Sequence, residues 1–101
     1  MSMEKIMQEE ARLTILKELA AESNKAISSE RMRRYLLTFL LIDKPREWVE
    51  QQFQFLHDMG AVDIVPAGSV KIARLTERGE HHLQGIISIA GVLRPSTRAG
   101  S

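Results

Sequence analysis

The sequence of 101 residues predicts a mainly α-helical domain that carries one small β-hairpin. Three observations support this fold class. Apolar residues recur at helical spacing in three segments before residue 60, two short β-branched runs follow at 61–65 and 70–75, and another helical segment begins near residue 77. This length is typical of one domain with a modest core. We expect the domain to span residues 1–90 and a tail to follow at 91–101.

The first predicted helix spans residues 3–22 and has two apolar strips. One strip includes Ile6 and Leu13, and the other includes Met7 and Ile15. A helix that is apolar on two sides is usually buried on two sides. We therefore expect either a central core helix or a helix whose second strip contacts another copy of the chain.

The second helix is expected after the polar stretch ESNKAISS, which interrupts the helical pattern and predicts a turn. Ser28 or Ser29 can cap this helix by accepting a hydrogen bond from a free backbone N–H. Met32 and Leu36 are expected to face the core, with Arg31 nearer to solvent.

A third helix is predicted between Asp43, a good N-cap, and Gly60, which can adopt the left-handed conformation that ends a helix. Its apolar row consists of Val49, Phe53 and Leu56. Helical spacing puts these three side chains on one face, so we expect that face to be buried.

The β-branched runs AVDIV and VKIARL flank the sequence PAGS, which predicts a two-stranded hairpin with Gly68 near its tip. Thr76 is expected to cap a last helix over about residues 77–88. The segment GVLRPSTRAGS contains Pro, Gly and Ser, and we expect it to fray.

Three helices followed by a β-hairpin is the order of a winged helix-turn-helix. The expected fold class is therefore mainly α with a small β-hairpin, arranged as a winged helix. In that fold the third helix enters the major groove of DNA, and the hairpin is the wing. The hairpin between two helices is thus the feature that points to a nucleic-acid function.

Part of the chain, about residues 44–80, resembles winged-helix regulators of the MarR and ArsR types. The shared features are a helix ending in Leu56 to Gly60, an apolar strand, a glycine at the hairpin tip, and the sequence Leu-Thr-x-x-Gly from Leu75 to Gly79. This resemblance implies the fold more specifically than it implies a function.

Nearly the whole chain resembles a small protein family of Mu-like phages and prophages. The segments that carry this resemblance are EEARLTILKELA, LTERG and GVLRPS. Genes of that family lie near those for lysis and DNA packaging. The resemblance implies a cytoplasmic protein of an infected or lysogenic bacterium, and it carries no catalytic or binding residues to this chain.

The third helix offers candidate base-reading residues. With its apolar row inward, Arg46, Gln51 and Gln54 face solvent, and these residue types read guanine and adenine. The same face carries three acids, Glu47, Glu50 and Asp58. Three carboxylates repel phosphate, so this face is unusual for a groove reader.

Further cations could form a phosphate-binding rim around that helix. The hairpin supplies Lys71 and Arg74, and the second helix supplies Arg31 and Arg34. The alternative is that these side chains are ordinary solvated charges. The net charge of +1 supplies no overall basic field that would decide between the two.

The terminal segments carry more apolar side chains than a small core should need. Leu83, Ile87 and Leu93 follow the hairpin, and Met7 and Ile15 lie on the first helix. Surplus apolar surface often marks an interface. We therefore expect a homodimer through these residues, unless the tail folds back onto its own core.

Several functions are not expected. The chain has no cysteine, which excludes a disulfide scaffold and a thiolate metal site. His81 and His82 are adjacent and diverge by about 100° on a helix, so we expect no metal site. No catalytic motif, signal peptide or membrane span is visible, and we expect neither an enzyme nor a cofactor. Trp48 is expected to be buried, although it could stack on a base.

Two functional hypotheses follow. The first is a small winged-helix protein of a Mu-like prophage that binds double-stranded DNA in regulation or packaging. The second is a winged helix used as a protein-interaction module, for example an adaptor for another phage protein, without DNA binding. The near-neutral charge and the apolar terminal segments favour the second hypothesis.

Overall fold

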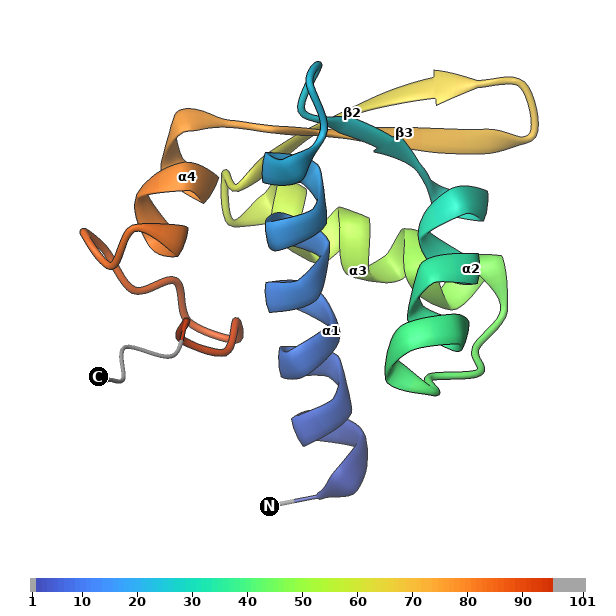
Figure 1. Cartoon of the computed structure of the whole chain (residues 1–101), viewed down its shortest axis with the longest axis horizontal. Coiled ribbons are helices and arrows are strands. Elements are labelled where there is room, and N and C mark those ends of the chain that lie inside the picture. Colours follow the sequence, from blue (N-terminus) through green and yellow to red (C-terminus); the bar gives the residue numbers. More distant parts are fainter. Residues whose placement is uncertain (1, 96–101) are drawn as a thin grey trace.

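A computed structural model describes residues 2–95, and helices form the larger part of them. The elements are, in chain order, α1 (Met3–Ala21), β1 (Ala26–Ser28), α2 (Ser29–Leu40), α3 (Arg46–Asp58), β2 (Val62–Ala67), β3 (Val70–Leu75) and α4 (Glu77–Leu83). Figure 1 shows α1 upright in the centre, with α2 on one side and α4 on the other. Helix α3 runs behind α1, and the sheet lies across one end of the helices.

The helix starts follow from their capping residues. The side chain of Ser28 accepts a hydrogen bond from the backbone N–H of Arg31, and that of Thr76 accepts one from Gly79. Both caps agree with the prediction. Asp43 was expected to cap α3, but the N-cap is Pro45. The reason is steric: a residue that precedes proline disfavours the helical conformation, so the helix cannot begin before Pro45.

The predicted turn at residues 22–29 contains a strand that sequence reasoning missed. Strand β1 pairs antiparallel with β3, with Ile27 opposite Ala73. The sheet therefore has three strands in the order β1-β3-β2, and β3 is central. Three residues are too few to show an alternating pattern, and the partner strand lies more than forty residues later in the chain.

The predicted hairpin is confirmed, and its register gives the sheet two distinct faces. On β3, Ala73 and Leu75 are buried toward the helices. Side chains alternate along a strand, so Lys71 lies on this helix-facing side and Arg74 lies on the opposite side. Arg74 is paired in register with Asp63 of β2. The tip of the hairpin extends past α2 (Figure 1).

The core lies where α1 meets α3 and the inner face of the sheet. The predicted row on α3 is confirmed, since Val49, Phe53 and Leu56 are all buried. Ile15 and Leu16 of α1 are fully buried as well. Helix α1 is thus the central core helix, which was one of the two alternatives. No helix within residues 2–95 is both long enough and apolar enough to cross a membrane.

Helix α4 ends earlier than residue 88. Its C-cap is Gln84, and Gly85 then adopts a left-handed conformation with φ 78° that turns the chain back. The part of the expected tail that the structure describes, residues 91–95, packs against α1 instead of fraying. Val92 is buried, and the backbone N–H of Leu93 donates to the carbonyl oxygen of Glu9 across 3.2 Å. Residues 96–101 lie outside the described residues.

Two side chains attach this C-terminal segment to the domain. The buried His82 accepts a hydrogen bond from the Ile89 backbone N–H at Nδ1 (3.0 Å), so its Nε2 must carry the proton that is donated to the Leu93 carbonyl oxygen (3.0 Å). Arg12 donates to the carbonyl oxygen of Gly91 across 2.9 Å. Its guanidinium also lies 3.7 Å from the ring centroid of Phe55. Burial lowers the pKa of Arg12.

Candidate nucleic-acid interface

Hydrogen bonds through Ser29 join the first residue of α2, Glu50 of α3 and the hairpin, and an ion pair adds Arg46. The backbone N–H of Lys71 donates to the hydroxyl of Ser29 across 3.1 Å. That hydroxyl donates to Glu50 Oε2 across 2.7 Å, and Arg46 Nε lies 3.4 Å from the same oxygen. Ser29 is fully buried. We call these four residues, Ser29, Arg46, Glu50 and Lys71, the Ser29 network.

The Ser29 network changes the charge expected on α3. Sequence reasoning placed Glu50 on the solvent face as one of three acids that repel phosphate. Only 17% of its side chain is exposed, it accepts from Ser29, and it is paired with Arg46. Glu50 is therefore a structural anion whose charge is balanced inside the protein. The acids left exposed on this helix are Glu47 and Asp58.

The predicted base-reading residues of α3 differ in their exposure and in whether their side chains already have partners within the protein. Gln51 and Gln54 are exposed, as expected. The side-chain amide of Gln54 donates one of its two N–H groups to Asp58 Oδ1 across 2.9 Å, which occupies part of its hydrogen-bonding capacity. Arg46 is two-thirds covered and paired with Glu50. Gln51 is thus the most available of the three.

The two cations of the hairpin do not lie together. Lys71 and Arg74 are three positions apart on β3, and an odd spacing puts side chains on opposite faces of a sheet. Lys71 lies on the side of α2 and α3, with its backbone in the Ser29 network. Arg74 faces the other way, beside Asp63. The structure therefore brings Lys71 and Arg46 toward one surface and separates Arg74 from them.

The arginines of α2 are mostly paired within the protein. Arg31 makes two hydrogen bonds to Glu22, of 3.2 and 2.9 Å. Arg33 makes two to Glu30, of 3.1 and 2.6 Å, and the hydrogen bond from Arg33 lowers the pKa of the Glu30 carboxyl. Arg34 is 73% exposed, and its Nε lies 3.5 Å from Glu30. Among the predicted rim residues on α2, Arg34 is the one with most of its surface free.

Trp48 is buried, as expected, and is not available to stack on a base. Its Nε1–H donates to Glu4 Oε2 across 3.2 Å, which ties α3 to the first turn of α1. The ammonium of Lys44 lies 5.9 Å from the ring centroid of Trp48 and 3.6 Å from Glu4 Oε1.

The residues expected at a dimer interface lie at different depths. Ile15 is fully buried inside its own chain, so its prediction as an interface residue is wrong; α1 is covered on that side by the rest of the core. Met7, Leu83 and Ile87 are half-buried against the core. Leu93 is 45% exposed and is the most accessible of the five.

Within residues 2–95, no group of three or more His, Asp or Glu side chains is placed to hold a metal ion. His82 points into the core, while His81 Nε2 lies 4.0 Å from Glu77 on the surface. Comparison of the chain with protein-family models, curated proteins and solved structures gives no match.

Proposed function

We propose that this chain is a winged helix-turn-helix protein of a Mu-like prophage that binds double-stranded DNA in regulation or packaging. The order of three helices, a short strand between the first two and a hairpin after the third supports this assignment. The observation that carries it is the Ser29 network, because it holds the hairpin backbone at Lys71 against α2 and α3. Strand alternation puts the Lys71 side chain on the same side as these helices.

In this proposal α3 lies in the major groove and the hairpin lies along the phosphate backbone. Gln51 contacts a base edge, and Arg46 contacts the DNA beside it. Lys71 and Arg34 contact phosphates on either side of the helix. Glu47 and Asp58 reduce the attraction to phosphate, so we expect moderate affinity that falls steeply with salt.

The opposite faces of the hairpin provide a matched experiment. We expect Lys71→Glu to weaken binding of a labelled DNA duplex by roughly tenfold or more, and to reduce the slope of log affinity against log salt by about one unit. Arg74→Glu makes the same change in net charge on the other face, and we expect less than a threefold effect. Fluorescence anisotropy at low and moderate salt, with random and phage-derived duplexes, measures both.

Each outcome has a distinct meaning. Equal weakening by the two variants would reject the placement of Lys71 at the interface and leave only a general charge effect. Preference for phage-derived duplexes would favour regulation over sequence-independent holding of DNA. No binding of the unmodified protein at low salt would reject DNA binding altogether.

A second candidate function is a protein-interaction module, including a homodimer or a complex with another phage protein. Three large apolar side chains near the start of α1 and the end of α2, those of Met3, Phe39 and Leu41, are well exposed. Leu41 is 84% exposed and adopts a left-handed conformation with φ 57°. Light scattering after size exclusion tests the homodimer: a dimer lost on Leu41→Asp supports it, and a monomer at high concentration rejects it.

A further inference from the structure

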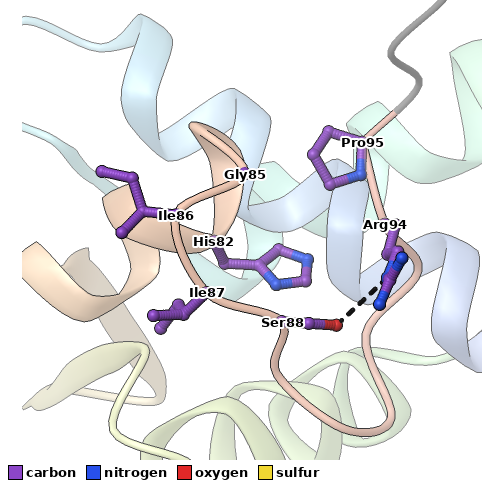
Figure 2. A pocket seen from close by; sticks show the side chains of 7 residues that line it. All are labelled: His82, Gly85, Ile86, Ile87, Ser88, Arg94 and Pro95. Atoms are coloured by element: carbon purple, nitrogen blue, oxygen red, sulfur yellow. Dashed lines mark hydrogen bonds between the residues drawn. The ribbon is translucent and has the colours of Figure 1, made fainter.

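A cavity of 320 Å³ lies between the last turn of α4 and the C-terminal segment, on surface that the proposed DNA contacts do not use. Figure 2 shows Ile86 and Ile87 on one side of it, Arg94 and Pro95 on the other, and the ring of His82 between them. Binding pockets for small molecules have volumes of about 300–1,000 Å³, so this cavity suits a ligand at the small end of that range.

The walls of the cavity are held in place before any ligand binds. Both ring nitrogens of His82 are hydrogen-bonded to the backbone of the C-terminal segment, at Ile89 and Leu93. Ile89 and Val92 anchor the same segment in the core. A preformed cavity loses less conformational entropy on binding than one that must first be ordered.

The polar chemistry of the cavity comes from Arg94. Its Nε donates to the Ser88 hydroxyl across 3.3 Å, which orients the guanidinium. Its two terminal NH₂ groups make no hydrogen bond or ion pair to the part of the chain that the structure describes. No acidic side chain lines the cavity within residues 2–95, so Arg94 is the only ionised group at its wall. His82 offers the cavity no free polar atom, because both of its ring nitrogens are already hydrogen-bonded.

We propose that this cavity binds a small amphipathic carboxylate, with its apolar body between Ile86, Ile87 and Pro95 and its carboxylate on Arg94. A guanidinium donates two parallel hydrogen bonds to a carboxylate, which fixes the orientation of the ligand. One arginine neutralises one negative charge, and the remaining wall is largely apolar. The cavity therefore suits a monocarboxylate better than a phosphate or a nucleotide.

A free organic acid and the C-terminal residue of a peptide both offer this chemistry. Hexanoate represents the first source and N-acetyl-leucine represents the second. Titration of each into the ¹⁵N-labelled protein, followed by amide shifts of the segment from Ile86 to Arg94, compares them. We expect saturable shifts with a dissociation constant near or below about 1 mM for at least one acid. The acid with the lower dissociation constant shows whether a free organic acid or the C-terminal residue of a peptide is the better ligand.

One ligand analogue and three variants test the roles of the carboxylate, Arg94 and the apolar wall. Hexanamide has the shape of hexanoate without its charge, and we expect it to bind at least tenfold more weakly. Arg94→Gln should weaken hexanoate binding by a similar factor, whereas Arg74→Gln, the same change elsewhere on the surface, should leave it unaltered. Ile86→Asp changes a side chain that is 63% exposed, so we expect the fold to tolerate it and hexanoate binding to be lost.

The proposal is overturned if neither acid shifts these amides up to about 10 mM. It is equally overturned if hexanamide binds as well as hexanoate, or if Arg94→Gln binds hexanoate as tightly as the unmodified protein. Failure of DNA binding leaves these results unaffected, because the proposal uses none of the residues assigned to DNA.

Discussion

The hydroxyl of Ser29 donates to the carboxylate of Glu50 across 2.7 Å, and this contact joins the first residue of α2 to the middle of α3. The same hydroxyl accepts from the backbone of Lys71, so a fully buried serine holds two helices and the hairpin together. The angle between α3 and the hairpin, on which the proposed DNA contacts depend, rests on this side chain.

Replacement of Ser29 by alanine should lower the free energy of unfolding by about 1–3 kcal/mol. The variant leaves the Glu50 carboxylate and the Lys71 backbone N–H without their buried partner. Urea denaturation measures the change. Ser69→Ala, at the exposed hairpin tip, is the matched control and should have little effect. A Ser29→Ala variant as stable as the control would contradict the structural role of the network.

Replacement of His82 by phenylalanine should lower the free energy of unfolding by about 2–4 kcal/mol, because the Ile89 N–H and the Leu93 carbonyl both lose a buried partner. The C-terminal segment should also become sensitive to proteases. Limited proteolysis with mass spectrometry locates the cleavage. His81→Phe provides the control on the neighbouring position, and equal sensitivity of the two variants would contradict the role of His82 in holding the C-terminal segment.

Two glycines in the C-terminal segment allow a matched comparison. Gly85 and Gly91 have φ values of 78° and 85°, so alanine at either position is strained by about 1–2 kcal/mol. A Cβ at Gly91 would also collide with the ring of Phe55, whereas one at Gly85 meets nothing within 4 Å. Thermal unfolding should therefore show a clearly larger loss for Gly91→Ala than for Gly85→Ala. Equal losses of thermal stability in the two variants would mean that the Phe55 ring moves aside at little cost.

Low pH should remove the contribution that the ion pair of Glu30 and Arg33 makes to the free energy of unfolding. The hydrogen bond from Arg33 lowers the pKa of Glu30 in the folded state below its ordinary value of 4.5. A group with a lowered folded pKa stabilises the fold above its unfolded pKa, and that contribution disappears as pH falls through the folded value. Urea unfolding between pH 7 and pH 2 should show this loss in the unmodified protein.

Glu30→Gln should reduce the acid-dependent loss, because no carboxylate remains at that position to be protonated. Glu47→Gln removes one acid from the exposed face of α3. This control variant should still lose stability at low pH as the unmodified protein does. An identical pH profile for Glu30→Gln and the unmodified protein would show that the pair does not contribute.

The local elements of this fold could be predicted from the sequence. Helical spacing identified the buried row of Val49, Phe53 and Leu56, and the residue type at Thr76 identified a helix cap. Each depends on residues within a few positions of one another. The alternation of β3 could also have shown that Lys71 and Arg74 face opposite ways, because that follows from their odd spacing alone.

Contacts between distant segments could not be predicted in this way. Strand β1 exists because β3 lies beside it, and three residues alone carry no strand signal. The residue type and position of Ser29 predict only a helix cap, because its bonds to Glu50 and Lys71 span 21 and 42 positions. The packing of the C-terminal segment depends on His82 and Arg12, whose partners are polar backbone atoms that no side-chain pattern reveals.

The sequence by itself therefore determined the helices, the hairpin and the apolar faces, because backbone preference and hydrophobic spacing act over a few residues. Only the tertiary structure decided which charges remain free and where they lie. It paired Glu50 with Arg46, placed the Lys71 face of β3 toward the helices, and folded the segment after α4 over the core. Charge pairing and burial depend on distance in space, which the order of residues does not contain.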